Sequence, residues 1–193
     1  MFIQVMQAKC SRVDEVRAFM ERWSGADSTG FLGGTFGVTD DGEFLGIVRF
    51  ESAEAASANS ARPETDSMSR EFAELLDGPV AFSDYDDVTE LLGGGSDEAG
   101  FVQVIRGHVD DVAAAKGFAS DPGDIQEMRP EIIGGTLAIA PDGDYTQTIS
   151  FTDEASARKG EQTEPPEEVR SELESMMAGA TFYDLTAPWF TSA

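Results

Sequence analysis

The sequence has 193 residues, 40% of them hydrophobic and 13 of them phenylalanine, which is enough for a packed core and excludes wholesale disorder. The formal net charge of −24 argues against nucleic-acid or anionic-membrane partners, because phosphates would repel such a chain. No apolar run approaches the ~20 residues of a membrane-spanning helix. With one cysteine, Cys10, and no signal-peptide pattern, we expect a cytoplasmic protein without an internal disulfide.

The chain opens with a predicted strand followed by a predicted helix. Residues 2–7 are an apolar run of strand length. Ser11 is a suitable N-cap, and Asp14 and Glu15 place carboxylates in the first turn, where the helix dipole favours them. Apolar residues then recur at helical spacing as far as Trp23.

A hairpin and a broken helix come next. Residues 31–38 and 44–50 read as strands around the turn Asp40-Asp41-Gly42. Helical sequence over 51–61 is interrupted at Pro63 and resumes over 64–76, and a strand follows at 80–85. The predicted order is therefore β-α-β-β-α-β.

The sequence pattern of this unit is repeated in the second half of the chain. The Gly-Gly-Thr, the Asp-Gly turn and the closing phenylalanine recur at a constant offset of 101 residues, from Gly33 to Gly134 and from Phe50 to Phe151. Because the glycine pairs lie inside strands and do not open a helix, they predict a bulge or a close backbone approach, not a phosphate-binding loop. The predicted elements of the second copy are 101–106, 109–119, 132–140, 145–151, 154–159, 167–177 and 181–185.

The duplication predicts two repeats, at 1–92 and 101–193, joined by a flexible Gly-rich linker at 93–100, with 187–193 as a tail. Helices cover only one face of each antiparallel sheet, so the two bare faces are expected to pack together. The predicted fold class is α+β: two ferredoxin-like repeats forming an intramolecular α+β barrel, a monomeric pseudo-dimer that could associate further.

This arrangement of two repeats of about ninety residues, each with a glycine-containing strand, a hairpin and an aromatic strand end, resembles the dimeric α+β barrel superfamily, and within it the antibiotic-biosynthesis-monooxygenase (ABM) type of domain. The resemblance implies a barrel with helices outside and a pocket between sheet and helices. It also implies one of several activities: cofactor-free oxygenation of polycyclic aromatics, haem degradation or isomerisation. No histidine lies near the second helical region of either repeat, so we expect no haem ligation by the family's route.

Polar residues on buried strands indicate where a pocket could lie. We assign the β-branched face of the first strand to the helices, which places Gln7, and Arg106 in the second repeat, in the sheet–helix space. Gln4 and Gln103 would then face the barrel interior. Burying such groups unpaired costs ~1–3 kcal/mol each, so either an internal hydrogen-bond network or a ligand must satisfy them. The other candidates for lining the first pocket are Trp23, Phe36, Asn59, Arg62, Met68 and Phe72.

His108, the only histidine, stands beside Asp110 and Asp111 and is either a surface residue in a turn, a general base or a metal ligand. Cys10 has no neighbour in sequence that would stabilise a thiolate, so we interpret it as a bystander. No metal-ligand spacing is present, and we expect neither a metal nor a cofactor.

Two functions remain open. The first is a small-molecule-binding protein for an apolar or aromatic ligand, as a cofactor-independent monooxygenase or isomerase would be. The second is a non-catalytic scaffold or interaction protein with a filled barrel. A cavity of ~300 Å³ or more between sheet and helices favours the first. Because the repeats differ at most of these polar positions, we expect the pocket in one half, and the first half is better supplied.

Overall fold

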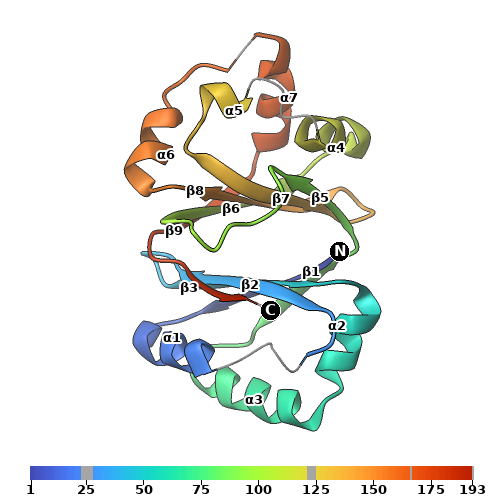
Figure 1. The fold of residues 1–193 in the computed structure, drawn as a ribbon, viewed down its shortest axis with the longest axis vertical. Coiled ribbons are helices and arrows are strands. Elements are labelled where there is room, and N and C mark those ends of the chain that lie inside the picture. The colour runs from blue at the N-terminus through green and yellow to red at the C-terminus, as the bar shows by residue number, and fades with distance from the viewer. Residues whose placement is uncertain (23–27, 121–124, 166, 193) are drawn as a thin grey trace. The chain divides into compact units, whose positions relative to one another are not determined.

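Two antiparallel five-stranded sheets, each with helices on one face, make up the fold in the computed structural model, which describes residues 1–22, 28–120, 125–165 and 167–192 (Figure 1). The chain divides into two compact units. Unit 1 comprises Met1–Asp86 and the segment from Ala187 onward, and unit 2 comprises Asp87–Thr186. The predicted α+β class and the ferredoxin-like order of each half are confirmed.

Unit 1 has its strands in the order β10-β2-β3-β1-β4. Ser52 caps the second of its helices, because its side chain accepts a hydrogen bond from the backbone N–H of Ala55. The predicted break at Pro63 is the first turn of the third helix, a position where proline costs no hydrogen bond. The elements are β1 (Phe2–Lys9), α1 (Val13–Arg22), β2 (Phe31–Val38), β3 (Glu43–Phe50), α2 (Ala53–Ser60), α3 (Pro63–Glu74), β4 (Ala81–Tyr85) and β10 (Trp189–Ser192).

Unit 2 repeats this plan with the order β5-β7-β8-β6-β9. Asp153 caps helix α6 (Glu154–Gly160) as Ser52 caps α2 in unit 1, because its side chain accepts a hydrogen bond from the backbone N–H of Ser156. The elements are β5 (Asp87–Leu91), β6 (Phe101–His108), α4 (Val112–Ser120), α5 (Ile125–Met128), β7 (Ile132–Ile139), β8 (Asp144–Phe151), α6 (Glu154–Gly160), α7 (Glu167–Met177) and β9 (Thr181–Leu185).

The glycine pairs lie where the sheets are irregular. The register shifts between Phe31 and Gly33 in one sheet and between Ile132 and Gly134 in the other, which confirms the predicted bulges. A Cβ on Gly134 would lie 2.1 Å from the carbonyl oxygen of Gly94, so this position also needs the close approach that only glycine permits.

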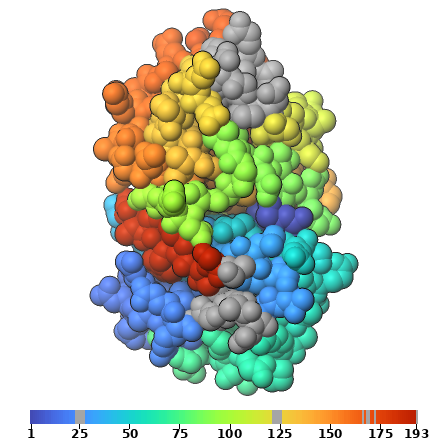
Figure 2. Space-filling view, in the orientation of Figure 1, coloured from blue at the N-terminus to red at the C-terminus, as the bar shows by residue number. Residues whose placement is uncertain are grey.

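The fifth strand of each sheet comes from the other repeat. β5 follows β4 directly in the chain but pairs with β7, and β10 follows β9 but pairs with β2. The predicted tail is therefore largely a strand, and residues 93–100, predicted as a linker between repeats, belong to unit 2. Figure 2 shows the red C-terminal strand directly against the blue surface of β2. Trp189 is buried in the core of unit 1.

The prediction of which strand face meets the helices was wrong. Phe2 and Ala8 belong to the same core cluster as Val16 of α1 and Phe72 of α3, and Met6 packs against it. The helices therefore cover the strand face that carries Phe2, Gln4 and Met6. In unit 2, Ile105 clusters with helix residues in the same way. β-Branched residues fit a pleated strand on either face, so their position does not report which face the helices cover.

Candidate functional site

A cavity of about 660 Å³ lies in unit 1 between the helix-covered face of the sheet and helices α1, α2 and α3. Strands β1, β3 and β4 supply its floor, and β4 is the edge strand of the sheet. Its apolar lining residues are Met6, Phe19, Met20, Val48, Phe50, Met68, Phe72, Ala73, Val80 and Phe82. Its polar lining residues are Gln4, Asn59, Ser60, Thr65, Asp66, Ser69 and Asp84.

Aromatic packing holds the inner wall. The ring of Phe72 lies 5.5 Å from that of Phe19 and 5.2 Å from that of Phe44, measured between centroids, so α1, α3 and β3 meet through three aromatic side chains. Such ring pairs stabilise the packing beyond their buried area. At the outer edge Phe82 is 59% exposed, although it lines the cavity. The inner wall is thus a packed core, and the rim carries an aromatic side chain in contact with solvent.

One polar wall is a cross-strand pair. Gln4 on β1 lies opposite Asp84 on β4, and the Gln4 Nε2 donates to the Asp84 Oδ1 at 2.9 Å. No lysine, arginine or histidine lines this cavity among the described residues. The two carboxylates at its surface, Asp66 and Asp84, therefore dominate its electrostatics, and Asp66 is paired with Arg70 at 2.6 Å.

A second polar group lies where α2 meets α3. The Ser28 hydroxyl donates to the Asn59 Oδ1 at 2.6 Å, and the Arg62 Nη1 donates to the Ser28 Oγ at 3.1 Å. Asn59 reaches the cavity, whereas Arg62 does not line it and acts on Asn59 through Ser28. The Asn59 side-chain amide is thereby held in one orientation, with the Thr65 hydroxyl of the cavity wall also donating to its Oδ1 at 3.5 Å.

The structure brings together three of the predicted site residues, Asn59, Met68 and Phe72, in this cavity. Phe36 is fully buried in the core and stacks on Phe44, with ring centroids 6.5 Å apart. Gln7 lies on the strand face opposite the helices, opposite Leu45 and Ala81 in the sheet, so its predicted place in the sheet–helix space was wrong. Trp23 lies outside the described residues.

Most of the lining residues were not among the predicted ones, including Gln4 and Met6 of β1, Val48 and Phe50 of β3, and the residues of α1 and β4. Gln4 and Met6 were missed because the faces of the first strand were assigned in reverse. Phe2 begins β1 and Phe50 ends β3, and this directly paired couple of aromatic residues was the available signal. Bulky aromatic rings fill the deep space below a helix layer better than β-branched side chains do.

The two candidates of the second repeat are not part of this site. Arg106 lies on β6 opposite Thr146 and Thr181, again on the face away from the helices, so that placement was also wrong. His108 ends β6, is half exposed, and pairs through Nδ1 with Asp144 Oδ1 at 2.8 Å. This hydrogen bond raises the pKa of His108 above its ordinary value.

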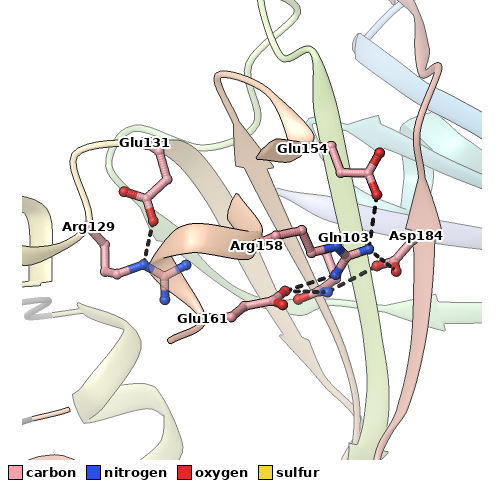
Figure 3. A network of polar contacts seen from close by, with 7 residues as sticks. All are labelled: Gln103, Arg129, Glu131, Glu154, Arg158, Glu161 and Asp184. Carbon is pink, nitrogen blue, oxygen red and sulfur yellow. Dashed lines mark hydrogen bonds and ion pairs between the residues drawn. The ribbon is translucent and has the colours of Figure 1, made fainter. Parts of the chain in front are cut away.

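Unit 2 has an equivalent cavity of about 310 Å³, into which charged side chains project (Figure 3). Gln103 Nε2 donates to Asp184 Oδ1 at 3.0 Å, repeating the Gln4–Asp84 pair. Arg158 on α6 donates to Asp184 and, at 3.0 Å, to Glu161. Its guanidinium carbon lies 5.1 Å from the ring centroid of Phe101. The Gln–Asp pair is common to both units, but among the described residues only the aspartate of unit 2 also accepts a hydrogen bond from an arginine.

Two general features of the described residues bear on the kind of protein. No helix in the described ranges has the length and apolar character needed to cross a membrane. Nor do His, Cys, Asp and Glu side chains of these ranges come together in any group of three that could hold a metal ion.

Comparison with known proteins identifies the fold. No family model and no curated protein matches the sequence. A crystal structure from Lactobacillus acidophilus NCFM named "putative monooxygenase" matches with a TM-score of 0.73 at 13% identity, over 99% of this chain and 95% of that one. A structure named "anthrone oxidase-like protein" matches with a TM-score of 0.65 at 10% identity, over 100% and 93%.

A third structure, from Listeria monocytogenes 4b F2365, is named an uncharacterized ferredoxin fold protein related to antibiotic biosynthesis monooxygenases. It matches with a TM-score of 0.52 at 9% identity, over 95% of this chain and 94% of that one. At such identities the likeness concerns the fold alone. Over its whole length, the chain has the duplicated ferredoxin-like fold of ABM-type proteins, as its sequence pattern predicted.

Proposed function

We propose that this protein binds a small, largely apolar or aromatic molecule in the cavity of unit 1. The observation that carries the proposal is the cavity itself: about 660 Å³ of space lined mainly by Phe, Met and Val, with a few polar groups at its walls. Pockets of ~300–1,000 Å³ with this kind of lining are typical of small-molecule sites. A protein with a filled interior, the alternative function, has no use for such a space.

Binding is tested with N-phenyl-1-naphthylamine, a neutral aromatic probe whose fluorescence rises in apolar surroundings. We expect saturable binding to the wild-type protein. The variant Ala73→Phe adds a ring at an exposed position that lines the cavity, and the matched control Ala58→Phe adds the same ring at an exposed position on α2 that does not line it. The cavity variant should lose affinity by about tenfold or more while the control stays within about twofold. Equal affinities in all three proteins would reject the site.

We further propose that the bound molecule is a substrate for oxygenation without a cofactor, in line with the names of the similar structures. Anthrone is a suitable test substrate because it is tricyclic, apolar and reactive toward O₂. Its oxidation to anthraquinone consumes one O₂ per anthrone and releases one water. An oxygen electrode and absorbance spectroscopy should record this stoichiometry, and Ala73→Phe should lower the rate. Saturable anthrone binding without oxygen uptake would leave a binding protein or an isomerase.

A further inference from the structure

The cavities of the two units are the same site built twice. The register of the sheets places Gln4 opposite Val48 and Asp84, and Gln103 opposite Ile149 and Asp184. Helices α2 and α6 begin at equivalent caps, Ser52 and Asp153, so residues along them correspond one to one. The lining positions that correspond are Gln4 with Gln103, Val48 with Ile149, Phe50 with Phe151, Ser60 with Glu161, Phe82 with Phe182, and Asp84 with Asp184.

In unit 2 two arginines, Arg129 and Arg158, line this site, and the guanidinium group of Arg158 is the one that reaches Asp184. Arg158 donates to Asp184, to Glu161 at 3.0 Å and to Glu154 at 3.3 Å, and its planar group lies over Phe101. The Arg158 side chain lines the cavity and is 37% exposed, so its guanidinium group stays in contact with water. The site in unit 2 thus holds a planar cation supplied by the chain itself.

In unit 1 no basic side chain of the described residues lines the corresponding site. The position of Arg158 is taken by Ser57 and that of Glu161 by Ser60, both too short to reach across the cavity. Asp84 keeps the hydrogen bond from Gln4, the contact that corresponds to Gln103–Asp184. Among the described lining residues of unit 1 there is no basic side chain, and the cavity is about 660 Å³ where unit 2 has about 310 Å³.

We propose that the unit 1 site selects ligands carrying a cationic donor group, such as an ammonium or amidinium, on an apolar or aromatic body. This rests on the proposed function, since it names the class of molecule bound in the same cavity. The apolar body lies among Phe19, Met68 and Phe72, and the cation binds Asp84 as Arg158 binds Asp184. Charge-assisted hydrogen bonds to a carboxylate are stronger than neutral ones, and the net charge of −24 favours approach of a cation.

The test compares three probes of one shape: 1-naphthylmethylammonium, 1-naphthalenemethanol and 1-naphthoate, measured by calorimetry at low salt. In the wild-type protein we expect the cation to bind about 5-fold more tightly than the alcohol, because Asp84 is exposed and solvent screens the pair, and the anion to bind most weakly. Asp84→Asn keeps an acceptor for Gln4 and removes the charge. Asp40→Asn, in the exposed turn between β2 and β3, is the control with the same charge change.

The preference for the cation should vanish in Asp84→Asn and persist in Asp40→Asn. Equal binding of cation and alcohol in the wild-type protein, or a preference that Asp84→Asn leaves unchanged, would overturn this inference and leave the proposed function standing. If none of the three probes binds to the wild-type protein, the proposed function itself fails. Because both substitutions are nearly isosteric and exposed, their folding is checked by circular dichroism before calorimetry.

Discussion

The charged residues that line the unit 2 cavity from α6 and its C-cap can be introduced into unit 1 by substitution. Replacing Ser57 and Ser60 on α2 with the residues of the corresponding positions on α6 gives the double variant Ser57→Arg/Ser60→Glu. Both serines are exposed, so neither substitution buries a charge. The introduced guanidinium should reach Asp84, as Arg158 reaches Asp184. We expect the free space in unit 1 to shrink from about 660 Å³ toward the 310 Å³ of unit 2.

The expected energies separate stability from binding. Partly exposed ion pairs contribute about 0–1 kcal/mol each, and arginine is a slightly better helix former than serine, so the free energy of unfolding should change by less than about 1 kcal/mol. Binding of the neutral probe N-phenyl-1-naphthylamine should weaken by about tenfold or more, because the space it needs is occupied. The affinity for the probe should therefore fall while the free energy of unfolding stays nearly unchanged.

The assay combines probe fluorescence with urea unfolding. The control is Ala58→Arg/Ala61→Glu, which introduces the same charges at exposed positions that do not line the cavity. The control should bind the probe as the wild-type protein does. Unchanged probe affinity in Ser57→Arg/Ser60→Glu would refute the equivalence of the two sites, and with it the reasoning that Arg158 stands in for a ligand.

Three further predictions concern unit 2 and strand β10. Tyr145→Phe removes the buried hydrogen bond of 2.6 Å that the hydroxyl donates to the Met176 carbonyl and should cost about 1–3 kcal/mol in urea unfolding; a smaller loss would mean that water replaces the donor. Trp189→Ala removes the buried anchor of β10 from the core of unit 1 and should cost about 3–5 kcal/mol; a surface-like loss below about 0.5 kcal/mol would contradict its place in the core. The pKa of His108 measured by NMR should lie above its ordinary value, and Asp144→Asn should lower it. Because the folded pKa of His108 is raised, its stabilising contribution is complete below the unfolded pKa and is lost as the pH rises through the folded pKa. An unshifted titration would contradict the pairing.

Three lining residues of the cavity were among those named from the sequence, but the strand face on which the cavity lies could not be inferred. The structure brings Asn59, Met68 and Phe72 together in one cavity because they lie on helices that face one sheet. Gln4 was assigned to the wrong side, since a strand presents alternate residues to both faces and its own sequence does not say which one the helices cover. Because the β-branched face of the first strand was assigned to the helices, the predicted site contained Gln7 and lacked the Gln4–Asp84 pair.

The sequence by itself determined the features that depend on neighbours in the chain. Turn residues, helix caps and hydrophobic periodicity act over a few residues, so the order of elements, the hairpins and the bulges at Gly33 and Gly134 could be predicted. Only the tertiary structure decided which strands pair across the repeats, because backbone hydrogen bonds can join any two strands of suitable length. It also decided that Arg158 lines the smaller cavity of unit 2 while no basic side chain of the described residues lines the cavity of unit 1, since this depends on how far side chains from separate elements reach into the same space.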